Sequence, residues 1–171
     1  MRLRRREVLA AGVVAALAGC VDGDDPEGGS PTEVTKTESP TDTADLDLRE
    51  ANVTGVELEP TDGRTFDVGV TLIHDDDGEE GYANWWQAET LDGERLGRRD
   101  LSHAHGTREF TRSADIDVPE DVSCVVVRGH DRTHQYGGQA MLVDVDSGET
   151  TARRQGVEPI GFSSADCPYT G

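Results

Sequence analysis

Two histidines separated by one alanine are the residues of this chain that most readily suggest chemistry. His103 and His105 lie in the stretch LSHAHGTREFTRS. On an extended strand, residues i and i+2 point to the same face, with backbones roughly 6.6 Å apart. Imidazole nitrogens are common ligands of zinc and copper, so the pair could supply two ligands of a divalent metal site. The alternative is two ordinary polar residues that share one face of a strand.

Three further histidines decide whether the pair could gain a third ligand. His74 ends the alternating stretch FDVGVTLIH, whereas His130 and His134 follow the apolar stretch VSCVVV. Because strand ends of a sandwich converge at one edge, we expect His134 and His74 to be the next ligands and His130 to be the last. Asp131 and Glu109 are the expected hydrogen-bond partners behind those ligands.

The elements that must position these histidines have the pattern of strands. Extended runs follow one another as ANVTGVELE, FDVGVTLIH, YANWWQAETL, RLGRRDLSHAH, REFTRSADIDV, VSCVVVRGH and GGQAMLVDV. Turn residues separate the runs, among them the Asp-Gly pair at 92–93. After the first 20 residues, no stretch has the 3.6-residue period of a helix. The sequence therefore predicts an all-β, antiparallel β-sandwich of about seven strands, immunoglobulin- or fibronectin-like in architecture, with a small β-barrel as the alternative.

Adjacent tryptophans on a strand must point to opposite faces. Trp86 shares its face with Tyr82, Asn84 and Ala88, so we predict that Trp86 lies in the core. Trp85 then faces outward. We expect arginine side chains or the C-terminal tail to cover it, the alternative being an exposed ring that stacks on a sugar or a partner.

The N-terminus has the pattern of an export signal with a lipid attachment site. In MRLRRREVLAAGVVAALAGC, arginines precede an apolar run that is too short to span a bilayer. RREVL resembles a twin-arginine signal, and LAGC resembles a lipobox whose Cys20 becomes the lipidated N-terminus. We therefore expect residues 1–19 to be a signal peptide and the protein to face outward from the cell membrane, held by lipid on Cys20. An uncleaved anchor helix or a cytoplasmic protein with an apolar start are the alternatives.

The next segment has the composition of a linker. Residues 20–45 are rich in proline, threonine and acids and have few apolar side chains, so we expect a disordered tether. Residues 46–171 form the predicted folded domain. In an exported domain, Cys124 and Cys167 are predicted to form a disulfide, the alternative being two free thiols. Asn52, in NVT, matches the acceptor pattern for N-glycosylation.

The charge balance excludes some partners. The chain has 35 acidic and 16 basic residues, for a net charge of −19, and Lys36 is its only lysine. Such a field repels phosphate backbones, so nucleic acid is not an expected partner. An acidic chain with almost no lysine resembles haloarchaeal proteins, which stay soluble in concentrated salt; an acidic cation-binding protein is the alternative. The acid-rich stretch HDDDGEEGY (74–82) is then expected to be a solvated loop.

Part of the chain resembles an uncharacterised extracytoplasmic bacterial family with the pattern H-x-H…FTRS…RD-x-x-H. The matching pieces are VTLIHDDDGEEGYANWW, DGERLGRRDLSHAH, FTRS and DRTHQYGG. Ala104 stands where the family has proline, and the spacing to Phe110 is shorter. The resemblance gives weight to one set of residues, His103, His105, Arg112, Asp131 and His134. It implies no activity.

These features together predict a lipid-anchored, monomeric cell-surface module that binds a protein or small-molecule ligand. We hypothesise that the histidines of this module form a binding site for zinc or copper. A metal-dependent enzyme or redox protein using the same histidines is one alternative, and a purely structural envelope protein is another. No nucleophile or phosphate-loop motif is present in the sequence, so a non-enzymatic role is favoured.

Overall fold

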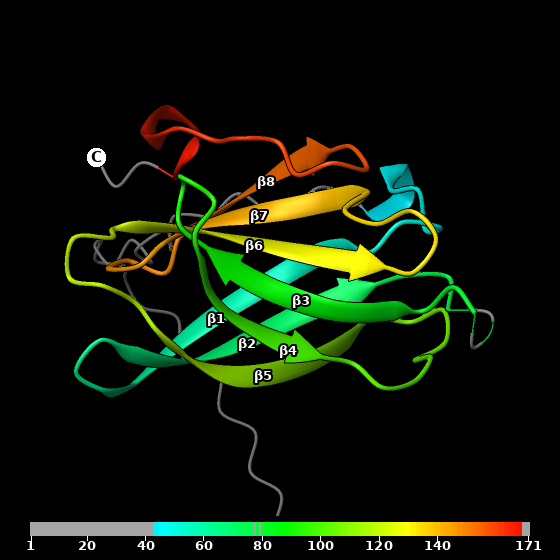
Figure 1. Cartoon of the computed structure of the whole chain (residues 1–171), viewed down its shortest axis with the longest axis horizontal. Helices are drawn as coiled ribbons and strands as arrows, with labels where there is room; N and C mark the ends of the chain where they lie inside the picture. Colours follow the sequence, from blue (N-terminus) through cyan, green and yellow to red (C-terminus); the bar gives the residue numbers. More distant parts are fainter. Residues whose placement is uncertain (1–42, 77, 79, 169–171) are drawn as a thin grey trace, which may run out of the picture. The chain divides into compact units, whose positions relative to one another are not determined.

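Figure 1 shows the computed structural model, which describes residues 43–168 except 77 and 79. The predicted signal peptide, Cys20 and nearly all of the predicted tether lie outside the described residues. The strands of the described part have the following order and bounds: β1 (Asn52–Asp62), β2 (Thr65–Ile73), β3 (Ala83–Glu89), β4 (Arg95–Asp100), β5 (Phe110–Asp117), β6 (Cys124–Asp131), β7 (Gly138–Asp144) and β8 (Thr150–Gln155).

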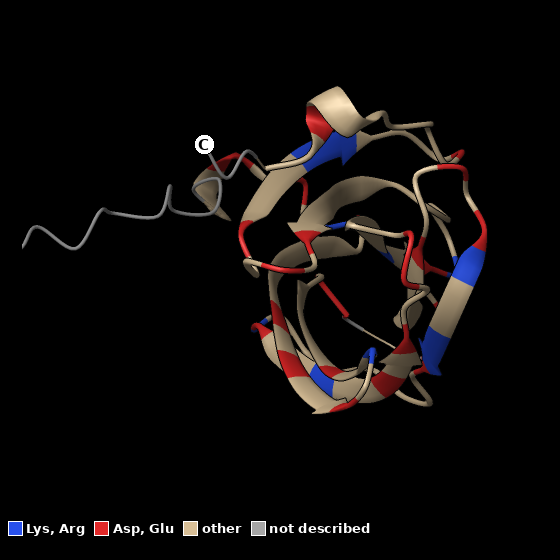
Figure 2. Cartoon of the chain, turned by 90° about the vertical axis from the view of Figure 1, so that its left-hand side faces the viewer, with Lys and Arg blue, Asp and Glu red and all other residues tan. Residues whose placement is uncertain are grey.

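The strands form two sheets in which every pair is antiparallel. A three-stranded sheet has the order β1-β2-β5, and a five-stranded sheet has the order β4-β3-β6-β7-β8. Figure 2 shows the two sheets facing each other, end on. The prediction of an antiparallel β-sandwich is confirmed, and the sheets do not close into a barrel. The sequence analysis did not predict strand β8. Its sequence, TTARRQ, lies at a sheet edge and does not alternate apolar with polar residues, so the pattern of a strand is missing.

Helical structure in the described residues is limited to two 3₁₀ turns, η1 (Thr43–Asp45) and η2 (Ser164–Asp166). Within this part of the chain there is no helix with the length and apolar character needed to cross a membrane.

The core lies between the inner faces of the two sheets. On β2, Phe66, Val68, Val70 and Leu72 are buried in alternation, as the period of two in the sequence predicts. Trp86 is fully buried opposite them, so its predicted place in the core is confirmed. Burial of such side chains supplies most of the stabilisation of a sandwich.

Two glycines allow close packing at opposite sides of the sandwich. A Cβ at Gly129 of β6 would lie 2.7 Å from the carbonyl oxygen of Ala51, directly before β1. A Cβ at Gly97 of β4 would overlap the side chain of Ile116 on β5. The absence of a side chain at these positions therefore lets β1 lie against β6, and β4 lie against β5.

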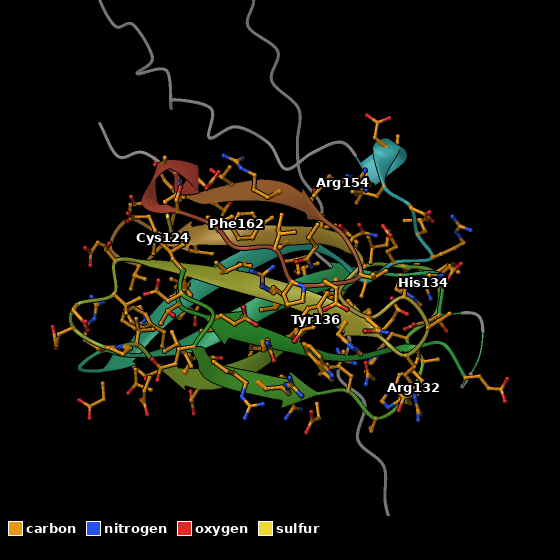
Figure 3. All side chains as sticks on the ribbon, turned by 45° about the horizontal axis from the view of Figure 1, so that its top comes forward. Cys124, Arg132, His134, Tyr136, Arg154 and Phe162 are labelled. Atoms are coloured by element: carbon orange, nitrogen blue, oxygen red, sulfur yellow. A yellow bond between two sulfur atoms is a disulfide. The ribbon has the colours of Figure 1, made fainter. Side chains whose placement is uncertain are left out.

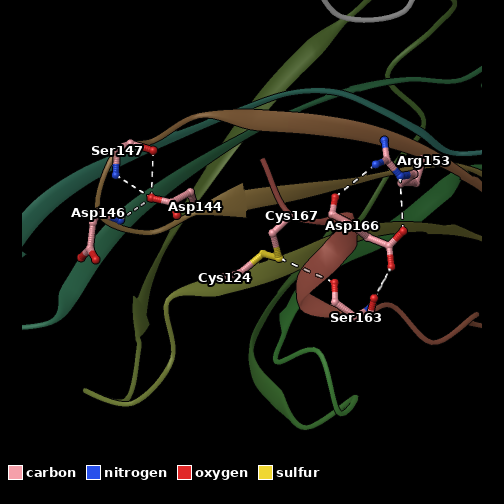
Figure 4. The surroundings of a disulfide bond; sticks show 8 residues. All are labelled: Cys124, Asp144, Asp146, Ser147, Arg153, Ser163, Asp166 and Cys167. Atoms are coloured by element: carbon pink, nitrogen blue, oxygen red, sulfur yellow. Dashed lines mark hydrogen bonds and ion pairs between the residues drawn. A yellow bond between two sulfur atoms is a disulfide. The ribbon is translucent and has the colours of Figure 1, made fainter. Parts of the chain in front are cut away.

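Part of the outer face of the five-stranded sheet, on β6 and β7, is covered by the C-terminal segment, residues 156–168. The buried residues on this face of the sheet form a second apolar cluster: Cys124, Val126, Ala140 and Leu142. Three partly buried residues pack against the cluster: Leu91, Phe162 and Cys167. The Cys124–Cys167 disulfide joins β6 to this segment, as predicted (Figure 4). The Asp166 carboxylate accepts hydrogen bonds from the Ser163 backbone and hydroxyl, which shapes η2 beside the disulfide.

A buried ion pair also holds the C-terminal segment. Arg128 Nε donates to Glu89 Oε2 at 2.8 Å, and both side chains are almost fully buried. Arg128 Nη2 donates to the carbonyl oxygen of Ile160 at 2.7 Å, and its guanidinium lies 5.1 Å from the ring centre of Phe162. The charge is therefore paired, hydrogen-bonded and covered by the segment that it binds.

Trp85 faces outward on the same sheet and is covered by an arginine, as expected. The guanidinium of Arg98, on the neighbouring strand β4, lies 3.8 Å from the centre of the Trp85 ring. The His130 ring stacks on it at 4.1 Å, and Tyr136 meets its edge at 5.2 Å. Trp85 is therefore buried, and its ring is not free to stack on a ligand.

Candidate functional site

The candidate site lies at the end of the sandwich where β2 and β6 end and β3 begins. His74 follows β2 directly, and Asp131 is the last residue of β6, paired with Ala83 at the start of β3. Figure 3 labels His134 and Arg132 in the adjoining β6–β7 loop. Antiparallel pairing thus brings residues far apart in sequence to one end of the fold.

His74 is buried between protein oxygens on both sides of its ring. Its Nδ1 lies 2.5 Å from Asp76 Oδ1, and its Nε2 lies 2.9 Å from the carbonyl oxygen of Arg49. Both nitrogens face acceptors, so the imidazolium is the form that satisfies both contacts. Burial alone would lower the pKa of His74, but the hydrogen bond to Asp76 and the charges of Asp76, Asp131 and Asp75 raise it above its ordinary value.

Asp76 is the carboxylate that organises this end of the sandwich. Its side chain is fully buried, and besides His74 it accepts the backbone N–H of Ala83 at 2.9 Å and that of His105 at 2.8 Å. Burial alone would raise the pKa of Asp76, but these hydrogen bonds lower it below its ordinary value. One carboxylate therefore ties the end of β2, the start of β3 and the β4–β5 loop together.

Asp131 plays a similar part in the β6–β7 loop. Its Oδ1 accepts the backbone N–H groups of Thr133 at 2.8 Å and His134 at 2.5 Å. Its Oδ2 lies 3.9 Å from His74 Nε2 and has no hydrogen-bond partner among the described residues. The Nδ1 of His134 lies 3.4 Å from Asp131 Oδ1, likewise without a hydrogen bond in the described part. His74 and His134 thus lie on either side of one buried carboxylate.

An open pocket of about 430 Å³ is lined by His74 and His134. The other side chains that line it carry hydroxyl and charged groups of both signs: Arg49, Asp75, Glu80 and Thr133. A pocket of this size and lining suits a small polar ligand. Of the residues that line it, His74 is held by two hydrogen bonds to protein oxygens.

The stretch with His103 and His105 is not a strand, which corrects the expectation that the two share a strand face. β4 ends at Asp100, and both histidines lie in the loop that leads to β5. The reason is that Asp76 captures the backbone N–H of His105, and the Asp76–Gly106 bridge turns the chain toward β5. The loop still places the two rings close together, with centres 4.5 Å apart.

His105 is the least satisfied of the five histidines. Its side chain is only 5% exposed, its ring stacks on Phe110 at 3.9 Å, and neither ring nitrogen has a hydrogen-bond partner in the described part. Its Nδ1 lies 3.8 Å from Asp76 Oδ2. Burial, followed by the charges of Arg112 and His103, lowers the pKa of His105, with Asp76 opposing. A neutral ring at this position is therefore favoured.

The remaining predicted residues lie elsewhere or make other contacts. His130 bonds Asn84 Oδ1 at 2.7 Å through Nδ1 and stacks on Trp85, away from the pocket, and burial lowers its pKa. Glu109 is exposed and contacts none of the described histidines through a hydrogen bond or ion pair. Of the two predicted supporting acids, Asp131 alone lies beside predicted ligands.

The structure brings the predicted metal ligands to one end of the fold without arranging them as a ligand set. Among the described residues, no three His, Cys, Asp or Glu side chains have the geometry to hold a metal ion. His74 is unsuited to be a ligand, because both of its nitrogens are hydrogen-bonded to protein oxygens. A metal site at His103, His105 and His134 stays a prediction.

The glycosylation prediction at Asn52 conflicts with the fold. Asn52 is fully buried at the start of β1. Its Nδ2 donates to the carbonyl oxygens of Asp47 at 2.8 Å and Glu50 at 2.7 Å, and its Oδ1 accepts the Gln139 N–H. A glycan on Nδ2 would displace these hydrogen bonds. The structure therefore argues against glycosylation at Asn52, whose side chain stabilises the fold.

Sequence reasoning missed Asp76, although a signal for it was present. The alternation that buries Val70 and Leu72 continues through His74 to Asp76, which places all four in phase. The acid-rich composition of the stretch suggested a solvated loop and hid this phase. A buried carboxylate was therefore detectable from the period of two alone.

The fold and site define an antiparallel β-sandwich with a histidine–carboxylate network beside an open pocket. The chain is similar to a protein of Halomicrobium mukohataei that carries the name "Putative lipoprotein", with 63% identity over 128 residues. The match covers 75% of this chain and 64% of the other protein, so the chain spans just under two thirds of that relative. No family model matches the chain, and no solved structure matches it.

Proposed function

We propose that the protein is a lipid-anchored protein of the cell surface, whose β-sandwich binds a small polar ligand in the open pocket beside His74. One observation carries the anchoring: of the three cysteines in the chain, Cys124 and Cys167 are joined to each other, which leaves Cys20 for lipid. Cys20 is also the residue that the lipobox-like LAGC presents. The name of the similar haloarchaeal protein agrees with this proposal.

One further feature supports a location outside the cell. Disulfides persist in oxidising compartments and are rare in reducing ones, and here one fastens the C-terminal segment. The acidic, lysine-poor composition supports a protein that works in concentrated salt. The outward orientation is part of the proposal.

The anchor is tested by metabolic labelling of cells with a radioactive lipid precursor. We expect label in the wild-type protein and none in Cys20→Ser. The double variant Cys124→Ser, Cys167→Ser is the matched control, since it removes the other two cysteines and should keep the label. Label that survives in Cys20→Ser would contradict lipidation at this residue.

The binding proposal rests on the open pocket and on the two hydrogen bonds that hold His74. We expect small polar compounds that bind there to raise the melting temperature of the wild-type protein by mass action. His134→Leu should abolish that rise, whereas His130→Leu, outside the pocket, should keep it. A compound that stabilises wild type and His134→Leu equally binds somewhere else and would argue against this pocket.

Divalent metal binding by His103 and His105 is the second candidate. The observation that favours it is the buried His105 ring, whose two nitrogens have no partner in the described part of the chain. Elemental analysis of protein purified in concentrated salt provides the test. Stoichiometric zinc or copper that is lost in His103→Ala, His105→Ala would support this site, and trace metal that is unchanged in that variant would exclude it.

A further inference from the structure

Arginines gather where β4 runs beside β5. The arginines of residues 95–112 are Arg95, Arg98, Arg99, Arg108 and Arg112, and we call them the arginine face. The same stretch has two acids, Asp100 and Glu109, although acids outnumber basic residues by 35 to 16 in the whole chain. Strand β4 is the strand with two blue bands at the right of Figure 2. This stretch therefore has a net charge of +3 (five arginines against two acids), whereas the whole chain has −19.

The fold places these arginines on the edge strand β4, in the β4–β5 loop and on the edge strand β5, with Arg98 on the outer face of its sheet, over Trp85. β4 is an edge of the five-stranded sheet and β5 is an edge of the other, and Gly97 packs against Ile116 between them. Arg99 is directly opposite the core residue Trp86, and Arg112 is directly opposite Val70. Opposite residues of an antiparallel pair share a face, so these two arginines border the gap between the sheets from either side.

The arginine face is not neutralised by the described part of the chain. Arg95, Arg99 and Arg108 are exposed and make no side-chain hydrogen bond or ion pair there. Arg98 bonds the amide oxygen of Gln87, and Arg112 bonds the carbonyl oxygen of Thr111.

Of the described arginines outside the face, Arg132 and Arg154 also have no carboxylate partner: Arg132 lies over the Tyr82 ring, and Arg154 donates to the carbonyl oxygen of Asp45. The other four differ. Arg49, Arg64, Arg128 and Arg153 each pair with a carboxylate. In a chain with so many acids, five arginines gathered between residues 95 and 112, none of them paired with a carboxylate in the described part, suit an anion from outside the chain.

We propose that the arginine face docks the domain on the phosphate headgroups of an anionic membrane. The guanidinium fork matches phosphate oxygens in a bidentate geometry, which explains why arginine suits this surface. The acidic remainder of the surface is repelled by the same membrane, so a single face can lie against it. Each arginine near an anionic bilayer strengthens binding about fivefold at physiological ionic strength. In concentrated salt, where charges are screened beyond roughly 3 Å, direct guanidinium–phosphate contacts are the part of this gain that remains.

This inference rests on the proposed lipid anchor, which supplies the membrane. Residues 21–42 separate Cys20 from the described domain. Even fully extended, such a segment reaches at most roughly 75 Å. Tethering at that scale gives effective concentrations near the millimolar range, so weak contacts by the arginine face would suffice to orient the domain.

The experiment measures vesicle binding of the full chain with Cys20→Ser, which carries no lipid. Vesicles of phosphatidylcholine alone are compared with vesicles in which about one third of the lipid is phosphatidylglycerol. The salt is the lowest at which the native circular dichroism spectrum persists. We expect binding to the anionic vesicles to exceed binding to the neutral ones, and Arg95→Ser, Arg99→Ser to weaken it on the order of tenfold.

A matched control separates the face from net charge. Arg132→Ser, Arg154→Ser removes the same charge from exposed positions outside the face and should leave vesicle binding close to that of the parent. Equal binding to both vesicle types would overturn the proposal, as would equal losses in the two double variants. Binding of a soluble acidic polysaccharide in place of the vesicles, lost in Arg95→Ser, Arg99→Ser, would also overturn it. Failure of the anchor itself is read separately from the label on Cys20.

Discussion

Loss of the Cys124–Cys167 disulfide should be the most informative single perturbation of the fold. The bond joins residues 43 apart in sequence. On the chain-entropy model, closing a loop of that length stabilises the native state by about 4 kcal/mol. Packing of the C-terminal segment adds to this stabilisation, because Phe162 and Leu142 lose contact if the segment leaves the sheet. We therefore expect Cys124→Ser, Cys167→Ser to lose at least about 4 kcal/mol of unfolding free energy.

The assay is equilibrium unfolding in urea at constant high salt, followed by tryptophan fluorescence. Cys20→Ser is the control, since Cys20 is outside the described domain. Hydrogen exchange adds a local readout: residues 156–168 should lose protection in the double variant even where β6 and β7 keep theirs. A loss of less than about 1 kcal/mol, with protection unchanged in the C-terminal segment, would refute the reasoning that the bond holds this segment down.

Three further predictions concern the buried contacts. Gly129→Ala should destabilise the domain by about 1–3 kcal/mol in urea unfolding, because the new Cβ meets backbone; an unchanged midpoint would show that β1 does not pack as described. Arg128→Met should cost about 3–5 kcal/mol in the same assay because Glu89 is left charged and buried, and the further change Glu89→Leu should recover part of it; no recovery would contradict an ion pair. His74 has a raised folded pKa and Asp76 a lowered one, so the pair should stabilise most between about pH 4 and 6.5, with the His74 part lost as pH rises through its folded pKa and the Asp76 part lost as pH falls through its own. A His74→Gln variant should flatten that profile, and an unaltered profile would contradict the charged pair.

Local patterns predicted the fold because they coincide with burial. The alternation from Phe66 to Leu72 predicted both the strand and its buried face, and the adjacent tryptophans predicted which ring enters the core. The cysteine pair predicted a cross-link, since an exported domain with two remaining cysteines has one pairing available. Each of these inferences depends on near neighbours in sequence or on simple counting.

The candidate site depended on contacts that no local pattern encodes. The residue types of the H-x-H stretch predict a strand. In the structure, the side chain of Asp76 accepts the backbone N–H of His105, and the stretch is a loop. Asn52 matches an acceptor triplet, but the backbone of Asp47 and Glu50 consumes its amide. Such side chain-to-backbone bonds join segments whose proximity exists only after the two sheets have packed.

The intact mass of protein extracted with detergent from membranes of its host tests the central claim most directly. The account predicts a chain that begins at Cys20 and exceeds its peptide mass by the mass of attached lipid, with two hydrogens fewer for the Cys124–Cys167 bond. A chain that still begins at Met1, or one without any added mass, would contradict the claim that this β-sandwich is held at the cell surface by lipid.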